Sequence, residues 1–453
     1  MNGRARASGW VAVFVLFAAY AVSFVDRQIV GLLVEPIKAS LAISDTRIGL
    51  LQGPAFGLFY TILGVPLGWL ADRTHRVRLI AAGITLWSVM TVFCGLATSF
   101  EMLFLARMGV GIGEAVLVPA GISLLADRFG PQDRALPMSV FTSGLSLGAG
   151  MALLLGGWFV AFAGHGAAAL PLIGAWLTGM QPWQVAFVLA GLLGLPVALA
   201  VLMLDEPARG GAEDANGPPA GGSALAYLRG SWLLFLPMLG GTAMLYLFSN
   251  ALSAWMPTLF IRQHGWSAAE VGVRLGLLIM GCAMAGNLAS GLLATHLARR
   301  GMADAPLRPM LLGSALMLPA AALACLAGDP AMVMAGFMLL YFGVALCFGV
   351  ATTAFVTITP PPLRARMVAI YLLVGNLLGL GLGPPSVGPL LDHLLHDPTK
   401  VGLALAFVAA PTLLLGLMLL WAARRGFALR ATELARPRCG AETNGQPDGS
   451  RID

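Results

Sequence analysis

Apolar stretches of about 20 residues recur from one end of the chain to the other, and each is long enough to cross the core of a lipid bilayer. Of the 453 residues, 58% are hydrophobic and only 11% are charged. A soluble domain carries about one quarter charged residues to cover its water-facing surface. The sequence therefore predicts an all-α membrane protein with no separate soluble domain.

The apolar stretches predict twelve transmembrane helices in two halves of six. Residues 1–204 form the first half and 229–423 the second. Between them, residues 205–228 include a run rich in Gly, Pro and Ala that cannot bury apolar surface and is expected to be a flexible cytoplasmic linker. The polar tail, 424–453, is expected to be disordered and cytoplasmic. The predicted helices are 10–36, 46–70, 79–98, 101–126, 135–163 and 183–204, then 229–261, 267–295, 307–327, 330–358, 364–395 and 400–423.

The basic residues predict the orientation of the chain, because Lys and Arg near helix ends resist translocation and stay in the cytoplasm. Twenty of the 27 Lys and Arg residues fall on one side of these helices, which places both termini in the cytoplasm. Only Lys38 and Lys400 are lysines, a preference that suggests a GC-rich bacterial source and hence the inner membrane. The basic residues are spread over many loop ends, so nucleic acid is not an expected partner.

The loop between the second and third apolar stretches reads G68-W-L-A-D-R-T-H-R-V-R78. A topology signal alone would account for its arginines, but not for their combination with Gly68 and Asp72. The spacing resembles the loop between helices 2 and 3 of the major facilitator superfamily of transporters. That resemblance implies two pseudo-symmetric six-helix halves around a central cavity, with a gating role for Gly68, Asp72, Arg73 and Arg76. Asp72 is predicted to pair across the cytoplasmic helix ends and to stabilise the outward-open state.

The second half echoes this loop weakly. The segment G291-L-L-A-T-H-L-A-R-R300 stands in the corresponding place, with Thr295 where the first half has its Asp. Weak internal repeats of this kind are typical of transporters built from two halves.

Further motifs resemble the spinster group of that superfamily, whose eukaryotic members move sphingosine phosphate or lysophospholipids. The group of organic anion–cation symporters shares the Asp-Arg pair of helix 1 and a Gly-x-x-Glu-Ala-like stretch in helix 4. Both groups therefore remain open from these residues. The motifs are D26-R27, G49-L-L-Q-G-P-A-F-G, W87-S, A106-R-M-G-V-G-I-G-E-A115, A126-D127 and G379-L-G-L-G-P-P-S-V-G-P-L-L-D392.

Four charged residues are predicted inside the membrane, where charges are costly and normally functional. They are Asp26 and Arg27 in helix 1, and Arg107 and Glu114 in helix 4. With a rise of about 1.5 Å per residue, Arg107 lies level with Asp26, and Glu114 lies about 10 Å deeper on the face of Arg107. Glu114 is predicted to take and release a proton while Arg27 or Arg107 holds an anionic head group. The alternative is a purely structural ion-pair network.

The second half offers no comparable charges, and its expected contribution is an aromatic cavity wall. A cavity with one charged and one aromatic wall suits an amphipathic substrate, although any single one of these residues is as readily explained by packing. Next to Glu114, Gly111 and Gly113 are expected to leave room for a neighbouring helix or a substrate. The candidate wall residues are Tyr246, Asn250, Trp255, Tyr341 and Phe348.

The sequence offers little support for an enzyme or a channel. It contains no H-E-x-x-H, G-x-S-x-G or P-loop motif, and a channel would need a filter repeated by symmetry. No metal or cofactor is expected, although His393 and His396 leave a surface metal site open as an alternative. The chain is predicted to be a monomeric secondary transporter in a lipid bilayer that couples protons to an anionic or zwitterionic amphiphile, such as a lysolipid or sphingoid lipid. The alternative is a proton symporter of organic carboxylates.

Overall fold

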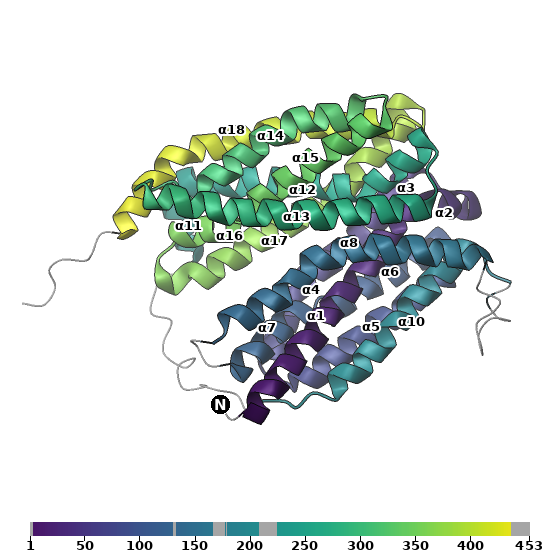
Figure 1. Ribbon diagram of the computed structural model, residues 1–453, viewed down its shortest axis with the longest axis horizontal. Helices are drawn as coiled ribbons and strands as arrows, with labels where there is room; N and C mark the ends of the chain where they lie inside the picture. The colour runs from purple at the N-terminus through teal and green to yellow at the C-terminus, as the bar shows by residue number, and fades with distance from the viewer. Residues whose placement is uncertain (1–2, 130–132, 166–176, 178, 208–223, 436–453) are drawn as a thin grey trace, which may run out of the picture.

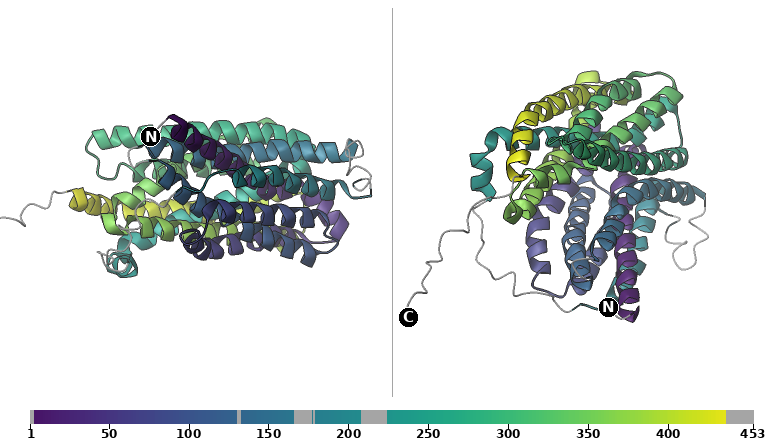
Figure 2. Two further views of the ribbon diagram at one scale, coloured as in Figure 1. Left: turned by 90° about the horizontal axis from the view of Figure 1, so that it is seen from below. Right: turned by 60° about the vertical axis from the view of Figure 1, so that its left-hand side comes forward.

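The computed structural model describes residues 3–129, 133–165, 177, 179–207 and 224–435. All regular elements in these residues are helices, and twelve stretches are long and apolar enough to cross a membrane. The predicted all-α membrane fold is therefore confirmed. Figures 1 and 2 show two helical bundles side by side, the first half in purple to teal and the second in green to yellow.

The first half contains six membrane spans, two of which are broken. Helix 2 of the prediction is interrupted at Gly53, directly before Pro54, and helix 4 is interrupted at Ala115 and Val116. A short additional helix, α2, follows the first span. The elements are α1 (Gly3–Leu32), α2 (Val34–Leu41), α3 (Asp45–Gln52), α4 (Pro54–Ala71), α5 (Arg76–Gly95), α6 (Phe100–Glu114), α7 (Leu117–Arg128), α8 (Ala135–His165) and α10 (Pro182–Leu202).

The second half also contains six spans, and its breaks lie in the fourth and fifth. Its elements are α11 (Ala224–Gly230), α12 (Trp232–His264), α13 (Ala268–Arg299), α14 (Leu307–Leu326), α15 (Pro330–Phe348), α16 (Ala351–Thr357), the 3-10 turn η2 (Pro361–Leu363), α17 (Arg364–Pro389), the π-helical η3 (Leu390–Leu395) and α18 (Val401–Ala435).

The last helix is longer than the sequence predicts. A disordered tail is expected from residue 424, but α18 continues to Ala435. Phe427 is fully buried, and Arg424 pairs with Asp304 at 2.6 Å, so this part of the helix is held by both apolar and charged contacts. Residues 436–453 and 208–223, which carry the rest of the predicted tail and most of the predicted linker, lie outside the described residues.

The molecule has two distinct ends, which position every later feature. The start of α1, at the bottom of Figure 1, and the end of α18, at its left, belong to one end of the molecule, as the left view of Figure 2 shows, and we call this the terminal end. At the opposite, distal end lie α2 and α3. The halves meet through α8 against α13, α3 and α4 against α17, and α1 against α12.

Small residues let α8 and α13 approach closely. A Cβ atom at Gly272 of α13 would lie 3.0 Å from the Cα atom of Gly157 in α8, which is closer than ordinary packing allows. Close backbone contact of this kind is a common way for membrane helices to associate, because lipid supplies no hydrophobic force between them. The seam between the halves therefore depends on the absence of a side chain at Gly272.

The close packing of α8 against α13 predicts different outcomes for leucine substitutions at two glycines of α13. Gly272→Leu should lower the melting temperature of the detergent-purified protein, because overpacking typically costs about 1–3 kcal/mol. Gly281→Leu is the matched control, since a Cβ atom at Gly281 would meet nothing within 4 Å. Equal melting temperatures for the two variants would contradict the close packing of this seam.

Candidate functional site

A cavity of about 1170 Å³ lies between the two halves. It is lined by α1, α3, α4, α6 and α8 of the first half and by α12, α13, α15, α16 and α17 of the second. Towards the terminal end it reaches the exposed residues Thr142 and Ser143 of α8. Its lining towards the distal end includes Gly31 and Pro384. Both halves therefore line this cavity, and two of the four charged residues predicted inside the membrane, Arg27 and Arg107, belong to its lining.

An ion pair joins Arg27 of α1 to Glu114 of α6. The Nε and Nη2 atoms of Arg27 lie 2.8 and 2.5 Å from Oε2 of Glu114. Glu114 is only 1% exposed, whereas Arg27 is 17% exposed and lines the cavity. Among the described residues, Oε1 of Glu114 has no hydrogen-bond partner. The pair is therefore sealed on the carboxylate side and open to the cavity on the arginine side.

Three aromatic rings surround the Arg27 guanidinium. Its Cζ atom lies 4.7 Å from the ring centroid of Phe24 and 4.6 Å from those of Phe56 and Tyr60. Cation–π contacts at these distances stabilise a cation that has lost part of its hydration. The rings therefore hold the guanidinium in place even though one side of it faces the cavity.

Asp26 and Arg107 lie behind this pair, level with each other as their positions along the helices predict. Nη1 of Arg107 donates to the backbone carbonyl of Asp26 at 2.8 Å, and both side chains are buried. Arg107 lines the cavity, but Asp26 and Glu114 are absent from its described lining. The two arginines thus separate the two carboxylates from the cavity.

The glycines beside Glu114 do not leave room for a substrate. A Cβ atom at Gly111 would lie 2.5 Å from the carbonyl oxygen of Phe56, and one at Gly113 would lie 2.7 Å from that of Gly83. Of the two expected occupants, neighbouring helices fill this space, with α4 on one side and α5 on the other. Glu114 consequently communicates with the cavity through Arg27.

The second half forms an aromatic wall, with one correction to the prediction. Tyr246, Asn250, Tyr341 and Phe348 line the cavity, and the rings of Tyr246 and Phe348 lie 4.3 Å apart. The prediction of a wall position for Trp255 is wrong. Its side chain is fully buried, its Nε1 atom donates to the carbonyl of Pro384 at 2.9 Å, and it is not part of the described lining.

Among the polar residues of the lining that the sequence analysis missed are Gln28, Gln52 and Ser253. Gln28 directly follows the Asp26-Arg27 pair, and Gln52 lies within the G49-L-L-Q-G motif, so both were within reach of a search for polar residues in apolar helices. Ser253 has no comparable signal, because a serine in a membrane helix commonly bonds its own backbone.

Comparison with known proteins identifies the family. The model of the Major Facilitator Superfamily matches residues 16–384. The chain belongs to this superfamily of transporters. It is therefore an integral membrane protein that handles small-molecule substrates, and its two helical bundles are the two halves of the major facilitator fold.

Three relatives show the range of proteins that this superfamily member resembles. An "MFS-type efflux pump" of Mycolicibacterium smegmatis is 30% identical, with 94% of this chain and 95% of the pump covered. A "probable galactarate/D-glucarate transporter" of Bacillus subtilis is 25% identical, with 79% and 80% covered. The inward-facing, unoccupied crystal structure of a bacterial homologue of the human lysosomal transporter spinster superposes with a TM-score of 0.77 at 26% identity, covering 94% and 98%. The resemblance to spinster homologues is thus confirmed.

The superfamily loop at the terminal end centres on Arg76, which is 2% exposed. Arg76 pairs with Asp127 at the end of α7 and, at 2.7 Å, with Glu206 after α10. These contacts connect the start of α5, the end of α7 and the segment after α10, three parts of the first half that the sequence predicts to lie on the cytoplasmic side. Asp127 belongs to the A126-D127 motif of the sequence analysis. Glu206 was not predicted as a partner of Arg76, because it lies in the predicted linker.

The other predicted gating residues lie in α4 or directly after it. Arg73 stacks on Trp69, with Cζ 3.7 Å from the ring centroid. A Cβ atom at Gly68 would touch the side chain of Pro119 at 3.4 Å, and the N–H of Asp72 donates to the Gly68 carbonyl at 3.1 Å. The gating role of Asp72 stays a prediction.

Glu206 is held in its charged form. Partial burial raises the pKa of its carboxyl, but hydrogen bonds from the Val77 N–H and the Arg76 side chain outweigh burial and lower the pKa below the usual 4.5. A lowered pKa stabilises the folded protein at pH values above 4.5, and this contribution is lost as the pH falls through the folded-state pKa.

We therefore expect Glu206→Gln to lower the melting temperature at pH 7, and the difference from wild type to shrink as the pH falls below 4.5. Thermal unfolding in detergent between pH 7.5 and 3.5 measures both effects. Glu433→Gln is the control, since Glu433 is two-thirds exposed and pairs only locally with Arg430 among the described residues. A difference that does not change with pH would contradict the charged state of Glu206.

Proposed function

We propose that this protein is a proton-coupled secondary transporter that moves an amphipathic anionic or zwitterionic molecule, such as a lysolipid or a sphingoid lipid, by alternating access. It acts as a monomer in a bacterial inner membrane, with the terminal end in the cytoplasm. The observation that carries the proposal is the Arg27–Glu114 ion pair, whose arginine faces the cavity and whose carboxylate is sealed from it.

Arg27 is the proposed binding site for the head group. Its guanidinium already forms two hydrogen bonds to one oxygen of Glu114, but its open side faces the cavity. A phosphate or carboxylate that approaches from the cavity competes with Glu114 for the same donors. Arginine suits this exchange because its five N–H donors match such anions in geometry.

Proton coupling follows from this competition. When the substrate draws Arg27 away, Glu114 loses its counter-charge in an apolar environment, and a carboxylate in that position binds a proton more readily. Its Oε1 atom, which has no hydrogen-bond partner among the described residues, offers a site for the proton. When the substrate leaves, Arg27 returns and expels the proton. One proton thus accompanies each exchange of partner at Arg27.

The apolar part of the cavity supports an amphiphile. Phe24 and Phe56 flank Arg27 on the charged wall, whereas Ile279, Met284 and Phe348 lie on the second-half wall. A small, fully polar ion would leave these side chains facing water, while an alkyl chain would cover them. At roughly 25 cal/mol per Å² of buried apolar area, such a chain contributes substantially to binding.

A second candidate is a proton symporter of organic carboxylates. Its support is the similarity to the probable galactarate/D-glucarate transporter, together with two arginines, Arg27 and Arg107, on one cavity wall. The apolar second-half wall favours the amphiphile. Flux of lysophosphatidate and of galactarate into proteoliposomes, measured side by side, separates the two candidates.

Glu114→Gln should abolish flux driven by a proton gradient, while exchange of substrate without a gradient survives, because Gln preserves the shape of Glu114 but cannot release a proton. Counterflow and pH-driven flux in proteoliposomes measure the two activities. Glu101→Gln is the matched control, an exposed position on the same helix. If pH-driven flux persists in Glu114→Gln, the carboxylate is structural and Asp26 becomes the better candidate.

Arg27→Ala should weaken binding of lysophosphatidate by about 1.5–3 kcal/mol, the scale of a charge-assisted hydrogen bond. Binding of monoacylglycerol, a neutral lipid of similar shape, should change much less. Arg274→Ala is the control, because Arg274 is half-exposed at the distal rim and forms no part of the described cavity lining. Equal wild-type affinities for the charged and the neutral lipid would contradict head-group recognition by Arg27.

A further inference from the structure

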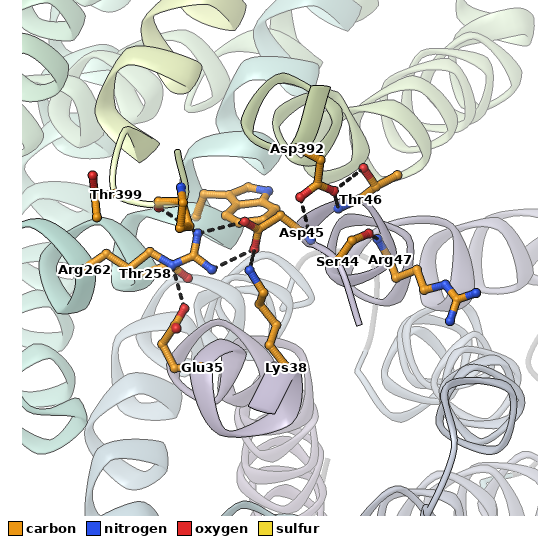
Figure 3. A network of polar contacts seen from close by, with 12 residues as sticks. Glu35, Lys38, Ser44, Asp45, Thr46, Arg47, Thr258, Arg262, Asp392 and Thr399 are labelled. Carbon is orange, nitrogen blue, oxygen red and sulfur yellow. Dashed lines mark hydrogen bonds and ion pairs between the residues drawn. The ribbon is translucent and has the colours of Figure 1, made fainter. Parts of the chain in front are cut away.

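A charged cluster joins the two halves at the distal end, and Arg262 of α12 is its centre (Figure 3). Its Nε atom donates to Glu35 of α2 at 2.6 Å. Its Nη2 and Nη1 atoms donate to the two carboxylate oxygens of Asp45 in α3 at 2.7 and 3.1 Å. Arg262 is 5% exposed and Asp45 is 1% exposed. This is a desolvated ion pair between opposite halves.

A second contact crosses the halves in the reverse sense. The carboxylate of Asp392 in η3 accepts hydrogen bonds from the backbone N–H groups of Asp45 and Thr46 at 3.2 and 2.7 Å, and from the Thr46 hydroxyl at 2.6 Å (Figure 3). It therefore caps the first turn of α3, where free N–H groups favour an anion. Lys38 also donates to Asp45 at 2.7 Å within the first half.

Two more polar contacts connect α1 to α12 between this cluster and the cavity. The hydroxyl of Thr258 donates to the carbonyl of Gly31 at 3.3 Å, and the amide of Gln28 donates to the hydroxyl of Ser253 at 3.0 Å. The contacts keep the same order along both halves, since residues 28 and 31 of α1 and 35 of α2 pair in turn with 253, 258 and 262 of α12. They form a ladder of three rungs, and the innermost rung lines the cavity.

We propose that this ladder is the gate that closes the distal end, and that Gln28 and Ser253 are its substrate-sensing rung. The outermost rung, Arg262 with Glu35 and Asp45, holds the gate shut. A polar head group that reaches Gln28 or Ser253 replaces their mutual hydrogen bond and weakens the ladder from the cavity side. The proposal rests on the alternating access of the proposed function, but not on the identity of the coupled carboxylate.

Opening is feasible because the outermost rung lies near water. Glu35 is 46% exposed, so water reaches the rim of the cluster even in the closed state. When the halves separate, water hydrates the charges of Arg262 and Asp45, which offsets part of the cost of breaking this buried pair.

The outer rung is tested by distances between spin labels in the full-length protein in liposomes, with no substrate or proton gradient. One pair, at positions 47 and 393, spans the distal end, and another, at 78 and 366, spans the terminal end. Arg262→Gln and Asp45→Asn should lengthen the distal distance and shorten the terminal one, with a change of at least about tenfold in the ratio of the two populations. Glu270→Gln is the control, an exposed carboxylate at the distal rim that pairs within its own half.

A second variant tests the gate without a change of charge. A Cβ atom at Gly49 of α3 would lie 2.9 Å from the Pro384 carbonyl and from Cα of Pro385 in α17. Gly49→Ala should therefore wedge the distal end apart and shift the distances in the same direction. Unchanged distances in Gly49→Ala, Arg262→Gln and Asp45→Asn would overturn the gate.

The sensing rung is tested with lysophosphatidate as the probe. The lipid should lengthen the distal distance in wild type and in Thr242→Ala, whose hydroxyl bonds only its own helix backbone among the described residues. It should have no effect in Ser253→Ala or Gln28→Ala. An equal response in all four proteins would overturn the sensing role. No response in wild type, with the outer-rung variants still open, would instead contradict the proposed substrate class.

Discussion

A charge inside the apolar core of a bilayer must be paired or must reach water, and this constraint organises the protein. In the first half it joins Arg27 to Glu114 across α1 and α6, with three aromatic rings around the guanidinium. The same constraint draws Arg107 to the carbonyl of Asp26. The helices that carry these residues are packed so that only the arginines reach the cavity.

The two halves share one fold but divide the chemistry between them. The first half supplies the buried charges, and the second supplies Tyr246, Tyr341 and Phe348 to the opposite wall. This asymmetry matches a substrate with one charged end and one apolar end. In the proposed function, the substrate contacts one wall through electrostatic attraction and the other through apolar burial.

The contacts between the halves are concentrated at one end. Towards the distal end, α1 and α3 meet α12 and α17 through polar contacts and close backbone packing. Towards the terminal end, Arg76 is held within the first half by Asp127 and Glu206. The described arrangement is therefore closed at the distal end. The same helices that close the distal end also line the cavity.

The sequence by itself determined the twelve spans, the division into halves and the shared level of Asp26 and Arg107, because length, apolarity and rise per residue are properties of a single helix. Only the tertiary structure decided which side chains meet. Arg27 pairs with Glu114 although the sequence predicts the two residues at different depths in the membrane. Trp255 is buried in the protein interior. Arg262 pairs with Asp45, which lies 217 residues away in the sequence. A helix that is apolar on all sides carries no signal of which face is buried. Its rotation and tilt are set by packing against its neighbours, which no single segment encodes.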